Sequence, residues 1–319
     1  MRTSAISVSG LRKAYGSKTV LDGIDFDVAA GSVFSLLGPD GAGKTTTIDV
    51  LTTLLRADAG TVRVAGHDVA TEPGQVRAAI GAMGRSAAVD ELLSGRGNLR
   101  RMADLKGVRS DSRVVGRLLE RFDLVESADS LAATYSAGMR RKLDLAMTLV
   151  GDPQVIFLDE PTTGLDPRGR RTVWGIVREL VAEGTTIFLT TRYLEEADQL
   201  ADQVAVLDRG RLAARGTPEE LKRRIPGTHV RFRFADLFEL DAAARVLAGS
   251  VRQDEELTLR VPSDGESKSL LALLGRLDAH AINAREFSVH TPDLDDVFRA
   301  DATAFTDRRA QEASVTLTG

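Results

Sequence analysis

The sequence predicts an α/β protein followed by a smaller α+β domain, and three features of the chain indicate this fold class. A glycine-rich stretch at 38–45 lies between an apolar run and a helical pattern, as in the opening strand–loop–helix unit of an α/β fold. Two further apolar runs, at 155–160 and 186–190, have the length and composition of buried strands. After the Pro-Gly pair at 226–227, shorter strand and helix patterns follow one another.

Length and composition agree with a soluble globular protein of two domains. The chain has 319 residues, of which 43% are apolar and 28% charged. A net charge of −4 argues against a general nucleic-acid binder, and the absence of cysteine excludes disulfides, thiolate zinc sites and a cysteine nucleophile. The N-terminus lacks a signal-peptide pattern, and no apolar run approaches the ~18 residues of a membrane-spanning helix. We therefore expect a cytoplasmic protein that reaches a membrane only through a partner.

The first thirty residues alternate apolar and polar side chains. Ile24, Phe26 and Val28, for example, are separated by aspartates. This period of two predicts half-exposed antiparallel strands. The continuous apolar run at 32–37 predicts a buried strand instead, and the stretch 44–55 predicts a helix with one apolar face.

The middle of the chain has a mainly helical pattern over 86–150, which we expect to form a helical subdomain. A further helix is predicted over 168–182, between the two buried strands. The stretch 205–216 has the pattern of a hairpin. Thr217 then caps a short helix in which Pro218 takes the first position.

The C-terminal part is predicted to be a separate domain. Pro226-Gly227 marks the boundary, so we expect domains at 1–225 and 226–304 and a disordered polar tail at 305–319. The order of patterns is roughly βαββαβ, compatible with a ferredoxin-like sandwich. The patterns are HVRFRF, a helix near 239–248, a weak strand near 249–252, ELTLRV, a helix near 267–278, and INAREFSVH.

The glycine-rich stretch fits the phosphate-loop pattern GxxxxGK[ST]. Its glycines let backbone N–H groups point at phosphate oxygens, and the helix that follows presents its positive end to the same anion. Lys44 is expected to reach the β- and γ-phosphates, and the Thr45 hydroxyl to ligate Mg²⁺. A structural glycine turn is the alternative, which the position between strand and helix disfavours. The expected ATP-binding residues are Gly38, Pro39, Asp40, Gly41, Ala42, Gly43, Lys44, Thr45 and Thr46.

Two carboxylates end the apolar run VIFLDE. A charge at the end of a buried strand is costly unless it has a partner or a function. Asp159 suits a Mg²⁺-associated carboxylate, and Glu160 suits a base that orients or activates the attacking water. The alternative is a turn that ends the strand before Pro161. The phosphate loop in the same chain favours the catalytic interpretation.

A third element, YSAGMRR at 135–141, precedes an apolar helix and has a serine suited to an N-cap. The order of phosphate loop, YSAGM, FLDEPTTGLDP and TTRYLEEAD resembles that of ABC-type ATPases over residues 5–225. In that family the motif at Ser136, Ala137 and Gly138 caps the γ-phosphate bound by the opposite subunit. The resemblance also assigns Asp166 to the loop along the dimer interface and Tyr15 to adenine stacking.

The resemblance implies an ABC-type ATPase core with an antiparallel β subdomain and the helical subdomain. It implies a homodimer that sandwiches two ATP molecules with Mg²⁺, without nucleic acid as a partner. The segment TPDLDDVF at 291–298 resembles the extension of the drug-resistance branch, which contains the ATPase subunits of daunorubicin-type exporters. Such a subunit would lie on the inner face of the cell membrane, bound to a separate integral-membrane permease. Glu91, Leu92 and Leu93 are candidate permease contacts, with ordinary helix surface as the alternative.

Four residues depart from the pattern of the family. Arg192 occupies the position of a histidine that contacts the γ-phosphate, Arg85 that of a Mg²⁺-sensing glutamine, Ala137 that of a glycine and Asp40 that of an asparagine. A guanidinium donates well to phosphate but cannot ligate Mg²⁺. Arg192 either donates to phosphate or pairs with Glu160 and neutralises it. Another possibility is that Arg85 and Arg192 act together on the γ-phosphate as arginine fingers.

These features support three functional hypotheses. The leading one is an ATPase subunit that powers a permease exporting drugs, lipids or other hydrophobic compounds. The second is a nucleotide-binding regulatory subunit with weak or no hydrolysis, because of Arg85, Ala137 and Arg192. The third, an ABC ATPase acting on DNA or ribosomes, is disfavoured by the acidic balance of the chain and the absence of zinc cysteines.

No catalytic constellation is visible in the C-terminal domain. Two of its histidines, His280 and His290, are isolated in sequence and more typical of structural or solvent-facing positions than of metal ligands. We therefore expect this domain to stabilise the dimer or to tune assembly with the permease.

Overall fold

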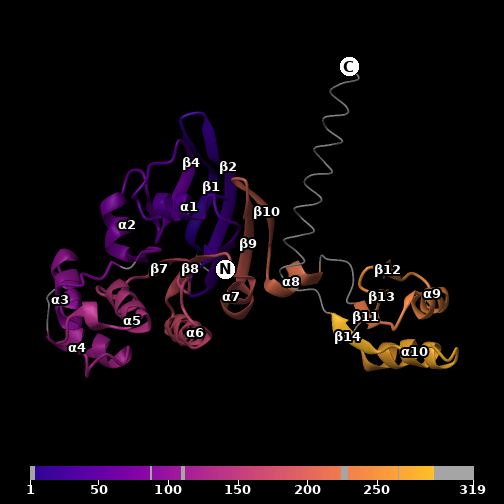
Figure 1. Cartoon of the computed structure of the whole chain (residues 1–319). Coiled ribbons are helices and arrows are strands. Elements are labelled where there is room, and N and C mark those ends of the chain that lie inside the picture. The colour runs from indigo at the N-terminus through magenta and orange to yellow at the C-terminus, as the bar shows by residue number, and fades with distance from the viewer. Residues whose placement is uncertain (1–3, 87, 109–111, 224–228, 265, 291–319) are drawn as a thin grey trace, which may run out of the picture. The chain divides into compact units, whose positions relative to one another are not determined.

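The computed structural model describes residues 4–86, 88–108, 112–223, 229–264 and 266–290 (Figure 1). The chain divides into two compact units, Met1–Pro218 and Glu219–Gly319. The boundary expected at 226–227, the drug-resistance extension at 291–298 and the tail from 305 onward lie outside the described residues. The domain limits drawn from the sequence therefore stay predictions.

The first unit contains an antiparallel sheet of four strands in the order β2-β1-β4-β5. Apolar side chains alternate with exposed ones along its two long strands, as the sequence predicts, because only one face of this sheet packs on a core. The strands are β1 (Ser4–Tyr15), β2 (Lys18–Ala29), β4 (Ala59–Val64) and β5 (His67–Asp68).

A second sheet of six strands, in the order β10-β9-β3-β8-β7-β6, forms the centre of the unit. Strands β9, β3, β8, β7 and β6 are parallel, and β10 pairs antiparallel with β9 in the predicted hairpin. Every residue of β3, β7 and β8 is buried, which explains their continuous apolar runs. The bounds are β3 (Val33–Leu37), β6 (Ile80–Met83), β7 (Val155–Asp159), β8 (Thr186–Thr191), β9 (Gln203–Asp208) and β10 (Arg211–Gly216).

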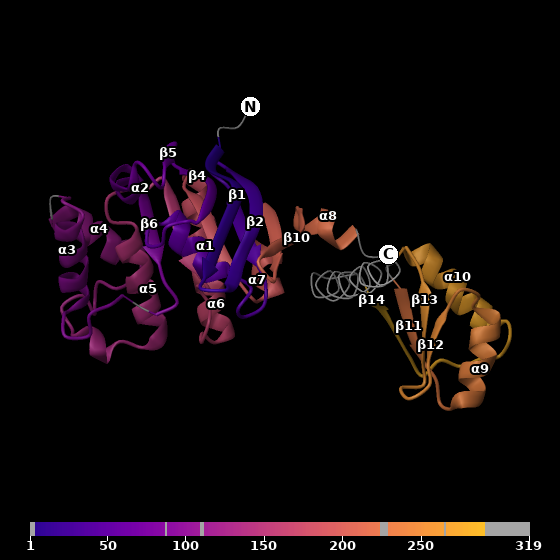
Figure 2. The ribbon, with the colours of Figure 1, turned by 90° about the horizontal axis from the view of Figure 1, so that it is seen from above.

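Helices cover this sheet and extend beyond its β6 edge, where α3, α4 and α5 gather (Figures 1 and 2). The helix expected over 44–55 ends at Leu51, so that prediction was too long. Thr53 adopts a left-handed backbone with φ 67°, which stops the helix and leaves Leu54 exposed. The helices are α1 (Lys44–Leu51), α2 (Pro73–Ala79), α3 (Gly95–Leu105), α4 (Ser112–Arg121), the 3₁₀ turn η1 (Ala132–Thr134), α5 (Ala137–Thr148), α6 (Pro167–Ala182) and α7 (Leu194–Leu200).

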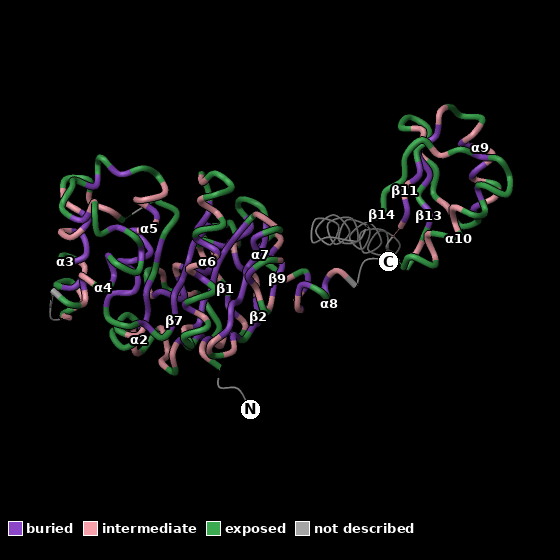
Figure 3. The backbone as a smooth tube through the Cα atoms, turned by 90° about the horizontal axis from the view of Figure 1, so that it is seen from below, coloured by how far each residue is buried: buried purple, intermediate pink, exposed green. Residues whose placement is uncertain are grey.

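The inner strands of the six-stranded sheet are buried along their length (Figure 3). This sheet separates two apolar cores, because alternate side chains of each strand point to opposite faces. Ile156 and Leu158 pack with α3–α6, whereas Phe157 packs with the antiparallel sheet and α1. A stack of Phe26, Phe34 and Phe188 joins the two sheets, with neighbouring ring centroids 5.1 and 5.4 Å apart. This packing holds the strand ends of the central sheet in fixed register.

The second unit begins with α8 (Pro218–Arg223) and has the predicted βαββαβ order with a ferredoxin-like fold. Its four strands are antiparallel in the order β12-β13-β11-β14. Side chains from both helices pack on one face of the sheet around Val230 and Phe232. The elements are β11 (His229–Arg233), α9 (Leu237–Val246), β12 (Val251–Gln253), β13 (Thr258–Pro262), α10 (Ser267–Asp278) and β14 (Glu286–His290). Among the described residues of the whole chain, no helix has the length and hydropathy needed to cross a membrane.

Candidate active site

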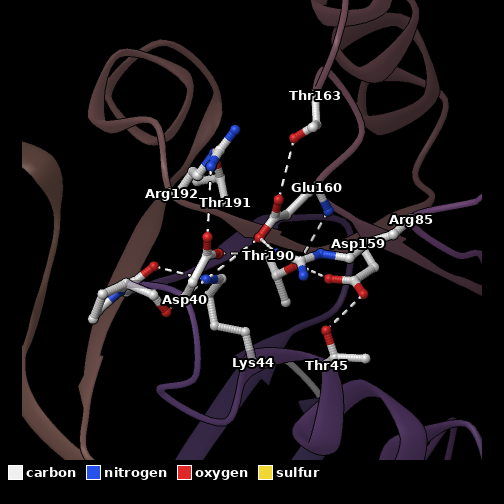
Figure 4. A network of polar contacts seen from close by, with 12 residues as sticks. Asp40, Lys44, Thr45, Arg85, Asp159, Glu160, Thr163, Thr190, Thr191 and Arg192 are labelled. Atoms are coloured by element: carbon white, nitrogen blue, oxygen red, sulfur yellow. Dashed lines mark hydrogen bonds and ion pairs between the residues drawn. The ribbon is translucent and has the colours of Figure 1, made fainter.

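The predicted catalytic segments follow four neighbouring parallel strands of the central sheet. β3 leads into the phosphate loop, β8 into Arg192, β7 ends at Asp159, and β6 is followed by Arg85. In the parallel register of the sheet, Leu37 lies beside Thr191 and Asp159 lies beside Thr190, so the carboxyl ends of β3, β8 and β7 lie side by side. In open α/β sheets the carboxyl ends of parallel strands form the ligand-binding edge. The fold thus gathers residues that are far apart in sequence (Figure 4).

The phosphate loop depends on its glycines for steric reasons. A Cβ on Gly38 would lie 2.3 Å from the carbonyl oxygen of Leu207. Gly43 has φ +112° and a Cβ there would lie 2.7 Å from Leu21 Cδ2, so a side chain is excluded twice at this position. α1 begins directly at Lys44, which places the positive end of the helix at the loop.

Lys44 is buried within the loop. Its Nζ donates to the carbonyl oxygens of Gly38 at 2.7 Å and Pro39 at 3.0 Å, and lies 3.4 Å from Glu160 Oε1. Burial lowers the pKa of Lys44, and the Glu160 carboxylate opposes this shift. The ammonium group is therefore held between the loop and the Glu160 carboxylate.

Asp159 and Thr45 meet as the sequence predicts for a Mg²⁺ site. The Thr45 hydroxyl donates to Asp159 Oδ2 at 2.9 Å, and the Thr190 hydroxyl donates to Asp159 Oδ1. Hydroxyl and carboxylate oxygens are the ligands that Mg²⁺ prefers, usually together with phosphate and water. Within the described residues there is no group of three or more His, Cys, Asp or Glu side chains that could hold a metal. The residues fit an ion shared with a nucleotide.

Glu160 has an unusual backbone. Its φ is 48°, in the left-handed region that non-glycine residues seldom occupy, and the residue is 3% exposed. The Glu160 amide donates to the Thr190 carbonyl at 3.1 Å, and the Thr163 hydroxyl donates to Glu160 Oε2 at 3.2 Å. Strain of this kind persists only where the surroundings determine it, and it is common at active sites.

Arg85 forms an ion pair with Glu160 Oε1 and a second one with Asp40 Oδ1 at 3.2 Å. The hydrogen bond from Arg85 lowers the pKa of Asp40, and the hydrogen bond to Glu160 raises the pKa of Arg85. A charged guanidinium therefore sits on the carboxylate that was expected to act as base. Because Arg85 is 46% exposed in its side chain, it has room to move away.

Arg192 does not pair with Glu160, so that interpretation of the residue is wrong for this structure. Its guanidinium lies 3.6 Å from Asp40 Oδ2, donates to the Tyr193 hydroxyl at 3.1 Å, and lies over the Tyr193 ring. The Tyr193 hydrogen bond raises the pKa of Arg192. Asp40 thus contacts both arginines, whereas Glu160 pairs with Arg85 and Lys44.

The residues assigned to adenine stacking and to the opposite subunit form no hydrogen bond or ion pair with this network within the described part of the chain. Tyr15 ends β1, half-exposed, with the Lys13 ammonium 5.7 Å from its ring centroid. Ser136 caps α5 by accepting from the Met139 amide at 3.2 Å, and Asp166 caps α6 by accepting from the Gly169 amide at 2.7 Å. These positions stay predictions for a site completed by a second subunit.

Ala137 and Gly138 form the first turn of α5. Neither belongs to the described residues with positive φ, so the alanine meets no backbone strain where the related pattern has glycine. This departure is therefore conformationally neutral in the present structure.

The sequence pattern did not reveal a role for Arg141, which the structure buries beside Glu160. Its guanidinium donates to the carbonyl oxygens of Glu160 at 3.1 Å and Pro161 at 2.6 Å and contacts Asp144. A charged pair spaced i, i+3 at the start of the stretch RKLDLAMTLV was the available signal.

Comparisons with known proteins agree with this geometry. Residues 21–163 match the protein family described as ABC transporter. The chain is 46% identical over 318 residues to the daunorubicin resistance ATP-binding protein DrrA3 of Streptomyces coeruleorubidus, covering 98% of this chain and 100% of that protein. It is 41% identical to the doxorubicin resistance ATP-binding protein DrrA of Mycobacterium tuberculosis, with 94% of each chain covered. It is 37% identical to the Nod factor export ATP-binding protein I of Ralstonia nicotianae, with 93% of each covered.

A solved structure of the ATP-binding subunit of an ABC transporter superimposes with a TM-score of 0.63. It is 29% identical and covers 69% of this chain and 92% of that chain. The structural match thus shows that this chain contains the fold of that ATP-binding subunit.

Proposed function

Because the chain belongs to the ATP-binding subunits of ABC transporters, we propose that it hydrolyses ATP, with Glu160 as the base, to power a separate membrane permease. The observation that carries this proposal is the convergence of Lys44, Thr45, Asp159 and Glu160 at the carboxyl edge of the central sheet.

The nucleotide is held by its phosphates in this proposal. The backbone of residues 38–46 surrounds the β- and γ-phosphates, Lys44 balances their charge, and Tyr15 stacks on adenine. Thr45 and Asp159 hold Mg²⁺, which supplies charge stabilisation to the transferred phosphoryl group. Thr46 follows in the first turn of α1, at the positive end of the helix.

Glu160 orients the attacking water and accepts its proton only after Arg85 has left the carboxylate. The ion pair would otherwise neutralise the base. Arg192, exposed at the end of β8, is placed to donate to the γ-phosphate once Asp40 releases it. Hydrolysis therefore requires both arginines to exchange carboxylate partners for phosphate or solvent.

A second copy of the chain completes the site. Ser136, Ala137 and Gly138 at the start of α5 are assigned to the γ-phosphate of the opposite subunit, and Asp166 to the dimer interface. The separation of these residues from the phosphate-loop network within one chain supports a homodimer that sandwiches two ATP molecules.

The permease is proposed to insert a helix into an apolar groove of about 500 Å³ beside β6. Leu54 and Leu105, 75% and 74% exposed, lie along this groove. Of the candidate contacts drawn from the sequence, Leu92 is exposed. The relatives named for drug resistance and Nod factor export support an exporter of drugs, lipids or other hydrophobic compounds, located on the inner face of the membrane.

A second candidate function is a regulatory subunit that binds nucleotide with little hydrolysis. The Arg85–Glu160 ion pair favours it, because a carboxylate held by a guanidinium is a poor proton acceptor. Steady-state turnover at saturating ATP separates the two candidates.

The test is Mg-ATP hydrolysis by the purified full chain, with and without its permease. Glu160→Gln serves as the blank and Arg192→His as the comparison. We expect turnover that the blank abolishes. ATP binding without turnover above the blank would instead support the regulatory function, and recovery in Arg192→His would locate the cause at that residue.

A further inference from the structure

Arg141 is a buried charged side chain in the helix that starts at the Ser136 motif. It lies on α5, is 7% exposed, and its guanidinium reaches out of the helix toward two loops. Nε donates to the Pro161 carbonyl at 2.6 Å, and Nη2 donates to the Glu160 carbonyl at 3.1 Å. Nη1 donates to the Gly84 carbonyl at 3.4 Å.

The charge of Arg141 has one close counterion. Asp144 Oδ2 lies 3.5 Å from Nη1, and Asp144 Oδ1 accepts from the Ala88 amide at 3.2 Å. Both side chains are buried, and removing one partner of such a pair leaves an uncompensated charge. A buried guanidinium with several acceptors in fixed positions is therefore a rigid connection rather than a surface contact.

The carbonyls that Arg141 binds follow the strained residue of the site. Glu160 has φ 48°, and its own carbonyl and that of Pro161 are both fixed by the same guanidinium. The Thr163 amide also donates to the Glu160 carbonyl, at 3.2 Å. Strained backbone needs surroundings that over-determine it, and Arg141 supplies two of these restraints from another helix.

The third carbonyl belongs to the residue before Arg85. Gly84 is adjacent in sequence to the arginine whose guanidinium pairs with Glu160. One side chain therefore contacts both segments that supply the partners of this ion pair. The helix that carries it begins at Ser136, the residue assigned to the nucleotide of the opposite subunit.

We propose that Arg141 is a positioning residue that couples α5 to the Glu160 carboxylate and to the Arg85 segment. A displacement of α5, on engagement of the Ser136 motif with the second nucleotide, moves the backbone of Glu160 and the segment of Arg85 together. The Arg85–Glu160 ion pair thereby opens or closes in response to the opposite site. This inference rests on the proposed function, because Glu160 is given the role of base.

The experiment uses the full chain and three variants with Mg-ATP. Arg141→Met removes the donors, Arg141→Lys keeps the charge without the fork, and Arg96→Met is the matched control. Arg96 forms an arginine–aspartate pair at the surface of the same helical region, with Asp129 at 2.8 Å, and so controls for the loss of an arginine charge away from the site. Steady-state turnover is measured together with hydrogen exchange of the segment 155–165, which does not depend on hydrolysis.

We expect Arg141→Met to lower kcat about tenfold with KM for ATP within about twofold of the wild type, as for a group that acts on the chemical step. Exchange of the amides at 160 and 163 should become faster, while the amides of α6 keep their protection. Arg141→Lys should not restore kcat, because a point charge cannot bind carbonyls in the fork geometry. Arg96→Met should behave as the wild type.

Two outcomes would overturn the proposal. One is unchanged kcat, whether or not exchange becomes faster, which would leave Arg141 with a structural role only. The other is a uniform rise of exchange along the whole first unit. Turnover of the wild type equal to that of Glu160→Gln would refute the proposed function instead, and the exchange of residues 160–163 would still decide whether Arg141 holds the Glu160 turn.

Discussion

The phosphate loop and the carboxylate–arginine cluster lie at the same edge of the central sheet but are built in different ways. The loop is determined by backbone sterics, since Gly38 and Gly43 leave no room for a Cβ. The cluster of Asp40, Arg85, Glu160 and Arg192 is determined by side-chain charges, and all of these side chains except Glu160 are more than two-fifths exposed. The comparison teaches that binding of ATP is built rigidly, whereas the hydrolytic step depends on charges that can change partners.

A substitution in the phosphate loop has the largest expected effect, which is on ATP affinity. Gly43→Ala should weaken ATP binding by about 100-fold, because the new methyl group meets Leu21 Cδ2 at 2.7 Å in a left-handed backbone position. Titration with a fluorescent ATP analogue measures the affinity. The control is Gly175→Ala, where a Cβ meets nothing within 4 Å. Unchanged affinity in Gly43→Ala would mean that the loop is as adaptable as the cluster.

Arg85→Gln tests the cluster. We expect turnover to rise about fivefold, because Glu160 is then free to accept a proton, while ATP affinity stays near that of the wild type. Arg85→Lys keeps the positive charge and should remain close to the wild type. A fall in turnover of Arg85→Gln would show that the guanidinium acts on the γ-phosphate as an arginine finger.

Asp40→Asn should have a smaller effect on ATP affinity. Asp40 belongs to the phosphate loop and also to the carboxylate–arginine cluster, so this variant tests both regions. The carboxylate contacts both Arg85 and Arg192, so its removal should strengthen ATP binding by about twofold to threefold at low salt. The gain should shrink as ionic strength rises, since these groups are exposed and screened. Isothermal titration at two salt concentrations measures it, and a gain independent of salt would contradict an electrostatic cause.

Glu196→Gln removes a buried carboxyl group from α7 and concerns stability alone. Burial raises the pKa of Glu196, whose Oε1 accepts from Trp174 Nε1 at 3.1 Å. Because the pKa of Glu196 is raised in the folded state, there is a pH range above the ordinary glutamate pKa in which the native protein keeps this proton and the unfolded chain has lost it. Stability of the wild type should therefore fall across that window, and the variant should lack this slope.

Thermal unfolding at pH 5 and pH 7.5 measures this difference. The Tm of Glu196→Gln minus that of the wild type should increase from the lower to the higher pH. Glu195→Gln, the exposed neighbour on α7, is the control and should show no such trend. A Tm difference independent of pH would mean that the Glu196 carboxyl has the same protonation in both states.

The neutralised base gives the cluster a functional meaning. In the proposed function, a resting subunit with Arg85 on Glu160 is protected from idle hydrolysis, since the carboxylate becomes available only when the arginine moves. The strained Glu160 backbone and the buried Arg141 place this control in the fold itself.

The sequence by itself determined the parts of this protein that depend on local spacing. The glycine pattern required a phosphate loop, the VIFLDE run required a buried strand ending in two carboxylates, and period-two alternation required the antiparallel strands. The βαββαβ order of the second unit was also predictable, because each element buries one apolar face of its own period.

Only the tertiary structure decided which charges meet. Arg85 and Glu160 are 75 positions apart in sequence, and neither local pattern predicts that they form an ion pair. The sequence also does not predict that Arg192 contacts Asp40 and Tyr193. The contacts of Arg141 could not be predicted either, because its acceptors are backbone carbonyls of two loops that are distant in sequence. Local sterics and hydrophobic periodicity act within a few residues of the chain. The reach of a long charged side chain depends on where strands β6, β7 and β8 end in space, which packing alone decides.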